Sequence, residues 1–122
     1  MDKTKGRSAK QFWPLLLIVL GVWSLSQAAS WWLARSQAQT LRELAKPGDI
    51  RMISSTTCVF CEKARRWMTA QAVPFQECFI ETDAACMSEY QARGARGTPT
   101  MVVRGQTQLG FDKQRVAQAL KL

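Results

Sequence analysis

Two cysteines lie three positions apart in the stretch Cys58-Val59-Phe60-Cys61. This stretch follows a predicted strand at residues 50–54 and opens a predicted helix that runs to about residue 71. The free amides and the dipole at a helix N-terminus stabilise an anion, so we expect Cys58 to ionise more readily than a free thiol. Cys61 lies one turn later on the same helix face, where it can attack a mixed disulfide formed on Cys58. The spacing predicts thiol–disulfide exchange, with Cys58 as the nucleophile and Cys61 as the resolving thiol.

A pair of cysteines at this spacing can also be half of a zinc site or a purely structural disulfide. A zinc site would need a second close pair, but the other two cysteines, Cys78 and Cys86, are eight positions apart. A structural disulfide across so short a loop adds little entropic stabilisation. The sequence contains no histidine, which excludes Ser/His and Cys/His hydrolysis and most zinc catalysis. We therefore expect neither a metal nor a bound cofactor.

Cys78 and Cys86 form the second pair of cysteines. Cys78 falls in a predicted strand at residues 75–80, and Cys86 falls early in a predicted helix at residues 84–92. We favour a structural disulfide between them, because an even number of cysteines in a small exported domain is typical of an oxidising compartment. Two buried free thiols, or a second redox relay with Cys61, remain as alternatives.

The predicted elements alternate between strands and helices in the order β-α-β-α-β-β-α. Asp83 and Asp112 are expected to cap the second and third helices, and the hydroxyls of residues 55–57 are expected to cap the first. The β-α-β opening predicts a parallel strand pair with a right-handed crossover, and the closing β-β pair predicts a hairpin. The remaining predicted elements are strands at residues 100–104 and 107–109 and a last helix that ends at about residue 120.

An uncharged, mostly apolar run at residues 12–33 follows four early cations, Lys3, Lys5, Arg7 and Lys10. A helix over this run would be about 33 Å long, which is enough to cross a bilayer. The cations predict a cytoplasmic N-terminus, so the rest of the chain would lie in the periplasm or outside. A signal peptide that is cleaved near Ala28, which would release a secreted protein, is the alternative.

These patterns divide the chain into four parts. Residues 1–11 are a basic cytoplasmic segment, 12–33 an anchor or signal sequence, 34–47 a helical stalk or a short helix packed on the domain, and 48–122 a globular domain. The net charge of +8 is shared as +5 over residues 1–47 and +3 over residues 48–122, and no basic patch is interleaved with aromatic residues. We therefore expect no binding to nucleic acid.

The strand–CxxC–helix pattern, together with Gly97-Thr98-Pro99-Thr100, resembles the thioredoxin superfamily, and its size and element order resemble a glutaredoxin over residues 49–120. The resemblance implies an α/β thioredoxin-like domain in which Pro99 is cis and faces the cysteines. It also implies that the Thr98 backbone pairs with a substrate chain, and that Val59 and Phe60 contact the substrate. Lys63, Arg65 and Arg66 follow in the same helix and are interpreted as a solvated face.

The function that the resemblance implies is that of a thiol–disulfide oxidoreductase. Its partners would be protein thiols or disulfides and an unknown redox partner, met on the exported side of the membrane. Glutaredoxins usually carry Gly-Gly and an acidic or Ser residue where this chain has Gly110-Phe111-Asp112, so glutathione as the reductant stays an alternative. A thioredoxin fold that serves as a non-enzymatic assembly or binding module is a further alternative.

Overall fold

The computed structural model describes residues 8–122, and side chains from Lys10 onward. These residues divide into two compact units, one that ends at Arg35 and one from Ser36 to Leu122. Three of the four early cations, Lys3, Lys5 and Arg7, lie outside the described residues.

Helix α1 (Ser8–Leu44) contains the whole apolar run. Every large apolar side chain from Phe12 to Leu33 is exposed, with exposed fractions between 51% and 73%. By length and composition, this helix is suited to crossing a membrane. The sequence-based prediction of one long apolar helix is therefore confirmed, while its place in a membrane stays a prediction.

The last turns of α1 belong to the second unit. Leu41 is fully buried there, and Ala38 and Ala45 are 2% and 7% exposed. Arg42 Nη1 donates to the carbonyl oxygen of Gln71 at 3.4 Å, which ties this segment to the end of the helix after the cysteines. Of the two interpretations of residues 34–47, the structure shows a helix packed on the domain from residue 36 on.

A four-stranded sheet with the order β2-β1-β3-β4 forms the centre of the second unit. The predicted element order from residue 50 on is confirmed, and each predicted boundary of these elements lies within one residue of the observed one. The strands are β1 (Ile50–Ser54), β2 (Gln76–Phe79), β3 (Thr100–Val103) and β4 (Gln106–Leu109), and the helices are α2 (Val59–Ala70), α3 (Ala84–Ala92) and α4 (Lys113–Lys121).

Strand pairing follows the predicted topology. Strands β1 and β2 run parallel with Arg51 opposite Gln76, and β3 lies antiparallel to β1 with Ile50 opposite Val103. Strands β3 and β4 form the expected hairpin. Its tight turn uses Gly105 at a φ of 84°, a left-handed conformation that costs glycine little.

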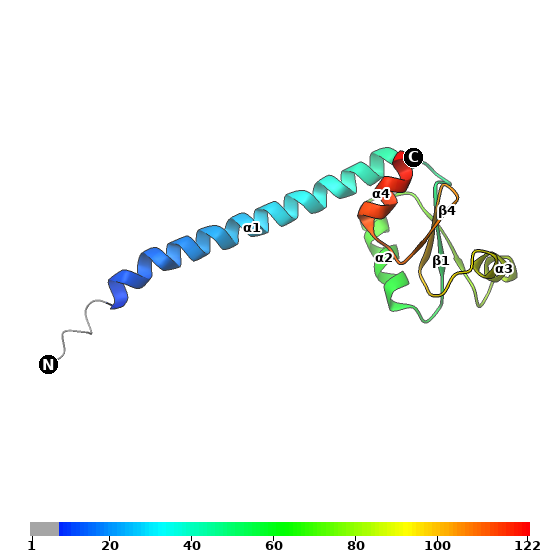
Figure 1. The fold of residues 1–122 in the computed structure, drawn as a ribbon, viewed down its shortest axis with the longest axis horizontal. Coiled ribbons are helices and arrows are strands. Elements are labelled where there is room, and N and C mark those ends of the chain that lie inside the picture. Colours follow the sequence, from blue (N-terminus) through cyan, green and yellow to red (C-terminus); the bar gives the residue numbers. More distant parts are fainter. Residues whose placement is uncertain (1–7) are drawn as a thin grey trace. The chain divides into compact units, whose positions relative to one another are not determined.

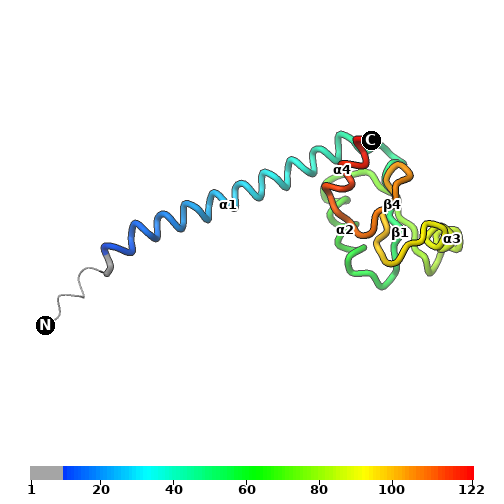
Figure 2. The backbone as a smooth tube through the Cα atoms, viewed as in Figure 1, coloured from blue at the N-terminus to red at the C-terminus, as the bar shows by residue number. Residues whose placement is uncertain are grey.

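Helices cover both faces of the sheet (Figures 1 and 2): α2 and α4 lie on one face, and α3 lies on the other. Successive strand residues point to opposite faces, so Met52 and Met101 join the larger core while Ile53 and Val102 pack with Cys86 of α3. The larger core contains three fully buried methionines and side chains from α2, α4 and the end of α1. Its members are Leu41, Ala45, Ile50, Met52, Ala64, Met68, Val73, Met101, Val103, Val116, Ala119 and Leu120.

Candidate active site

Cys58 and Cys61 form a disulfide at the start of α2, with their Cα atoms 5.2 Å apart. Cys58 is the N-cap of the helix, and its backbone is extended, with φ −94° and ψ 108°. The Cys61 backbone N–H donates to Cys58 Sγ over 3.0 Å. A sulfur atom thus takes the place that a hydroxyl or carboxylate oxygen usually takes at a helix N-terminus. When the disulfide opens, a thiolate at this position would meet the same amide and the positive end of the helix dipole.

The two cysteines differ in how far solvent can reach them. Cys58 is half-buried, whereas Cys61 has no exposed surface. The residues between them, Val59 and Phe60, are 61% and 70% exposed. A substrate sulfur can therefore approach Cys58 directly, which agrees with the predicted role of Cys58 as the nucleophile.

The turn before Cys58 is held by Glu81, which lies between β2 and α3. Glu81 accepts hydrogen bonds from the Ser55 hydroxyl and, over 3.1 Å, from the Thr56 backbone N–H. The Cys58 backbone N–H donates to the Ser55 carbonyl at 3.2 Å, so the turn leads directly to the nucleophile. The Ser55 hydroxyl bond lowers the pKa of Glu81, with a smaller contribution from the Thr56 amide.

The prediction that the hydroxyls of residues 55–57 cap α2 is wrong. Cys58 itself caps the helix, and the Ser55 hydroxyl contacts the side chains of Glu81 and Thr57 instead. The physical reason is position, because the N-cap residue directly precedes the first helical residue, and here that residue is Cys58.

Pro99 enters β3 through a cis Thr98–Pro99 bond, as the resemblance implied. Pro99 is buried and Thr98 is half-buried. The Pro99 carbonyl accepts from the Gly110 N–H at 2.8 Å, and the Thr100 hydroxyl donates to the Gly97 carbonyl at 2.7 Å. These bonds fix the loop that carries Thr98 against the end of β4.

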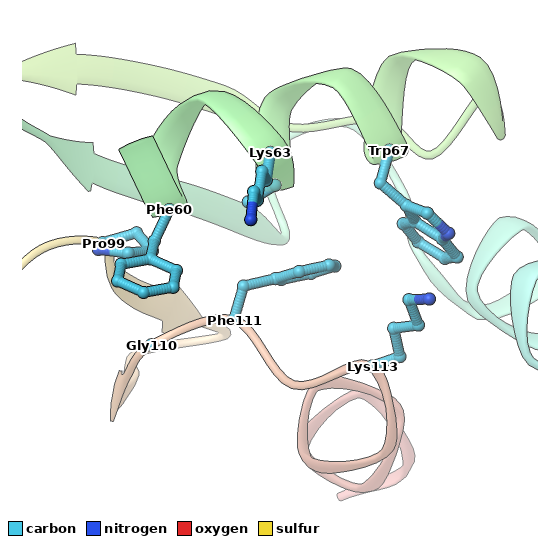
Figure 3. Close-up of a pocket in the computed structure, with 8 residues that line it drawn as sticks. Phe60, Lys63, Trp67, Pro99, Gly110, Phe111 and Lys113 are labelled. Atoms are coloured by element: carbon cyan, nitrogen blue, oxygen red, sulfur yellow. The ribbon is translucent and has the colours of Figure 1, made fainter. Parts of the chain in front are cut away.

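A pocket of about 470 Å³ lies between α2, Pro99 and the segment that leads into α4 (Figure 3). We call it the aromatic pocket, because three aromatic side chains, Phe60, Trp67 and Phe111, line it. The Trp67 and Phe111 rings lie 5.6 Å apart between their centres, tilted by 49°. The other lining residues are Lys63, Ala64, Pro99, Gly110 and Lys113.

The sequence predicted Phe60 and Pro99 at this site but missed the rest of the aromatic pocket. Trp67 is only partly buried, packed against the larger core. Phe111 and Lys113 follow the hairpin, far from the cysteines in the chain, so their spacing carries no signal. The aromatic residue in Gly110-Phe111-Asp112, directly before a predicted helix, was the one hint in the sequence.

The interpretation of Lys63, Arg65 and Arg66 as a solvated face is wrong for Arg65. Arg65 donates to both carboxylate oxygens of Glu77, at 2.7 and 3.0 Å. This hydrogen bond to Glu77 raises the pKa of Arg65. Arg66 pairs with Glu62 on the surface, and Lys63 lies 5.8 Å from the centre of the Phe60 ring. One cation of the three thus fastens α2 to β2 rather than facing water.

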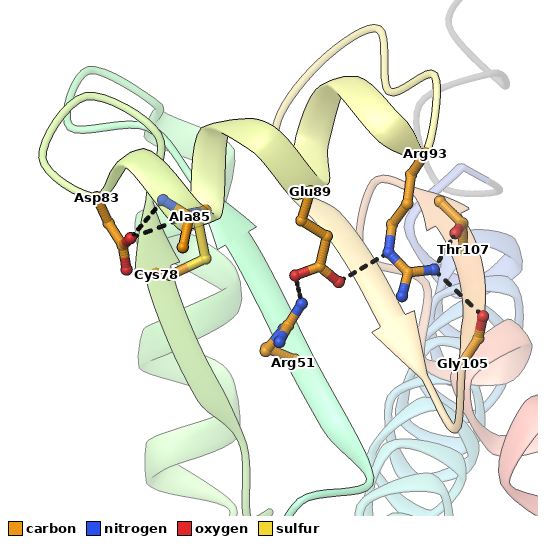
Figure 4. Close-up of polar contacts among 9 residues, drawn as sticks. Arg51, Cys78, Asp83, Ala85, Glu89, Arg93, Gly105 and Thr107 are labelled. Carbon is orange, nitrogen blue, oxygen red and sulfur yellow. Dashed lines mark hydrogen bonds and ion pairs between the residues drawn. A yellow bond between two sulfur atoms is a disulfide. The ribbon is translucent and has the colours of Figure 1, made fainter.

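Cys78 and Cys86 also form a disulfide, with their Cα atoms 6.0 Å apart. It joins β2 to α3 on the face of the sheet opposite α2 and α4 (Figure 4). Asp83 caps α3 as predicted, because its carboxylate accepts from the amides of Ala85 and Cys86. Further along α3, Glu89 pairs with Arg51 of β1 and with Arg93. The second disulfide therefore belongs to a set of contacts that fasten α3 to the sheet.

Comparison with known proteins gives one family model that the sequence matches. The glutaredoxin family model matches residues 50–107. No curated protein sequence matches the chain significantly.

Solved structures with the same fold include a mutant of the thioredoxin-like protein BC3987, with 23% identity and a TM-score of 0.54. The match covers 61% of this chain and 96% of that one. A glutaredoxin from Methanosarcina mazei Go1 matches with 20% identity and a TM-score of 0.50, over 62% of this chain and 80% of its own. Residues 50–107 thus match the glutaredoxin family model, within a domain of thioredoxin-like fold that is preceded by one long apolar helix.

Proposed function

We propose that this protein is a thiol–disulfide oxidoreductase that exchanges disulfides with protein substrates through Cys58 and Cys61. The observation that carries the proposal is the position of Cys58 Sγ at the N-cap of α2, bonded to the Cys61 amide at 3.0 Å. A purely structural disulfide needs neither this stabilised sulfur nor the exposed Val59 and Phe60 beside it.

The exchange proceeds in two displacement steps when the cysteine pair is reduced. The Cys58 thiolate attacks one sulfur of a substrate disulfide, whose S–S bond breaks, and the departing thiolate takes a proton from water. Cys61 then loses its proton and attacks Cys58 Sγ, which breaks the mixed disulfide and releases the second substrate thiolate. Two electrons pass to the substrate, and the pair ends as the Cys58–Cys61 disulfide. The reverse sequence oxidises a substrate dithiol.

We place this chemistry on the exported side of a membrane. The apolar side chains of α1 from Phe12 to Leu33 are exposed to a degree that suits lipid better than water. The early cations favour an N-terminus in the cytoplasm. The Cys78–Cys86 disulfide is typical of an oxidising compartment such as the periplasm. A signal peptide cleaved near Ala28 would export the domain as well.

The direct test is disulfide exchange by the full chain in detergent micelles. We expect the reduced protein to open the disulfide of a small neutral reagent, hydroxyethyl disulfide, and to end with Cys58 and Cys61 joined. Cys58→Ser should remove this reaction, since no accessible nucleophile remains. An unchanged rate in Cys58→Ser would overturn the proposal and favour a non-enzymatic module. A rate that depends on glutathione would assign glutathione as the reductant.

A further inference from the structure

We propose that the aromatic pocket selects substrates: it binds a protein segment that carries, beside its reactive cysteine, an apolar side chain and an acidic residue. This inference rests on the proposed function, because it names the substrate class of the same site. It assigns a binding role to Lys63, Trp67, Phe111 and Lys113.

The walls of the aromatic pocket suit an apolar side chain. Its volume of about 470 Å³ lies within the range of roughly 300–1,000 Å³ that is typical of ligand sites. Trp67 and Phe111 form one wall as a tilted ring pair, and Phe60 lies near Pro99 at the other end (Figure 3). Apolar contact with such rings is favourable because it removes hydrocarbon surface from water.

Two residues that line the aromatic pocket are chain neighbours of the reactive groups. Phe60 directly precedes Cys61, and Pro99 directly follows Thr98. A segment whose sulfur is bonded to Cys58 therefore has its neighbouring residues close to the aromatic pocket. The 70% exposed Phe60 ring is available to that segment.

The positive charge of two lysines at the edge of the aromatic pocket favours binding of a carboxylate. Lys63 comes from α2 and Lys113 from the first turn of α4, and no acidic residue lines the aromatic pocket. Within residues 8–122, neither lysine forms an ion pair with a carboxylate. Both ammonium groups lie near rings instead, Lys113 at 4.4 Å from the centre of the Trp67 ring and Lys63 at 5.8 Å from that of Phe60.

The nearest carboxylates in the sequence are already engaged. Asp112 accepts hydrogen bonds from the amides of Gln114 and Arg115 at the start of α4, and Glu62 pairs with Arg66. The two lysines are therefore free to meet an acidic group on a partner, and opposite charges across an interface raise both specificity and association rate. Glutathione carries carboxylates but no apolar side chain that could fill the aromatic pocket.

The test uses the reduced full chain in detergent micelles and three peptide disulfides that differ only in two residues beside the cysteine. One peptide carries Phe and Glu, the second Ser and Glu, and the third Phe and Lys, with glutathione disulfide as a fourth substrate. We expect kcat/KM to be highest for the Phe–Glu peptide, about tenfold above each of the other peptides, because each loses one of the two favourable contacts.

The double variant Lys63→Met with Lys113→Met should bring the Phe–Glu and Phe–Lys peptides to similar kcat/KM values while Phe–Glu stays above Ser–Glu. Lys121→Met, which changes an exposed lysine of α4 outside the aromatic pocket, is the matched control and should keep all the ratios. Equal kcat/KM for the three peptides would overturn the inference. The inference would also be overturned if glutathione disulfide were the best substrate and the double variant slowed its reduction. Reduction of hydroxyethyl disulfide is the control for the proposed function. If the proposed function is wrong, this reaction and the peptide reactions are all absent, whereas failure of the inference alone leaves reduction of hydroxyethyl disulfide intact.

Discussion

At the scale of single residues, the difference between Cys58 and Cys61 sets the order of the reaction. Cys58 is reachable from solvent and lies at the helix N-terminus, whereas Cys61 is fully buried behind it. An external disulfide can therefore meet only the first sulfur, and Cys61 can act only on a bond that Cys58 has already formed.

Cys61→Ser should trap the intermediate. The variant keeps the nucleophile but lacks the resolving thiol, so mixed disulfides between Cys58 and substrate proteins should accumulate. Mass spectrometry of the adducts after non-reducing electrophoresis identifies the bonded cysteine. Cys58→Ser is the matched control and should form few adducts. Adducts on Cys61 in that control would reverse the assigned roles.

Glu81 connects the turn before Cys58 to the segment between β2 and α3. Its folded-state pKa is lowered from the usual 4.5, chiefly by the Ser55 hydroxyl bond, so folding favours the ionised carboxylate. The stabilisation that ionised Glu81 supplies is therefore present above about pH 4.5 and is lost as the pH falls through the lowered pKa.

Glu81→Gln should lower the thermal unfolding midpoint at neutral pH, because a neutral amide bonds the Ser55 hydroxyl and the Thr56 amide more weakly than a carboxylate does. The deficit should shrink in scans at successively lower pH, below 4.5. Glu43→Gln is the control, since this exposed carboxylate bonds only Gln39 of its own helix among the described contacts. A deficit that does not change with pH would mean that the charge of Glu81 does not hold the turn.

The spacing of Cys58 and Cys61 predicted the reactive pair because both residues belong to one helical turn. The contact between Ser55 and Glu81 joins residues 26 positions apart, and nothing in their local patterns pairs them. The same holds for Trp67 and Phe111, which only the tertiary fold brings together. Local chemistry was thus readable from the sequence, whereas contacts between distant segments were not.

At the scale of elements, capping residues and hydrophobic alternation predicted nearly every boundary. Asp83 and Asp112 accept from the first amides of α3 and α4, as their positions before each helix indicated. The end of α1 was harder to read, because its buried residues, Ala38 and Leu41, continue a helix whose side chains from Lys10 to Arg35 are exposed. Which face of this last part of α1 is buried depends on its contacts with the rest of the second unit.

Leu41→Ala should destabilise the second unit by roughly 2–5 kcal/mol, because it leaves a cavity in the main core. The measurement is thermal unfolding of the full chain in detergent, followed by near-ultraviolet circular dichroism. Leu25→Ala is the matched control, since it makes the same change in the same helix at a side chain that is 73% exposed. Equal unfolding midpoints for the two variants would show that residues 36–45 are a stalk rather than part of the fold.

The second disulfide should resist reduction longer than the first. Cys86 is 3% exposed and packs with Ile53 and Val102, so attack on the half-buried Cys78 would have to release the Cys86 thiolate into this apolar cluster. We expect two titratable thiols, at Cys58 and Cys61, in the mildly reduced but folded protein. Four thiols in that state would mean that the Cys78–Cys86 bond is not a protected structural link.

At the scale of the whole molecule, the charge pattern predicts the topology. A reporter that is active only outside the cytoplasm, fused after Leu122, should be active if the cations before the apolar run keep the N-terminus in the cytoplasm. Replacing Lys3, Lys5, Arg7 and Lys10 with Asn should reduce that activity, while replacing Lys113 and Lys121 should not. Activity of a cytoplasm-specific reporter at the same position would contradict the exported location of the domain.

The fully buried methionines of the main core allow transient opening of the folded domain to be measured. Met52, Met68 and Met101 have no exposed surface, whereas Met87 on α3 is 37% exposed. Among these four methionines, hydrogen peroxide should convert Met87 to the sulfoxide first, and it reaches the three core thioethers only when the sheet and helices separate. A polar sulfoxide fits poorly among Leu41 and Val116, and each such oxidation persists because no sulfoxide reductase is present to reverse it. The rate of core sulfoxide formation therefore reports how often the folded domain opens.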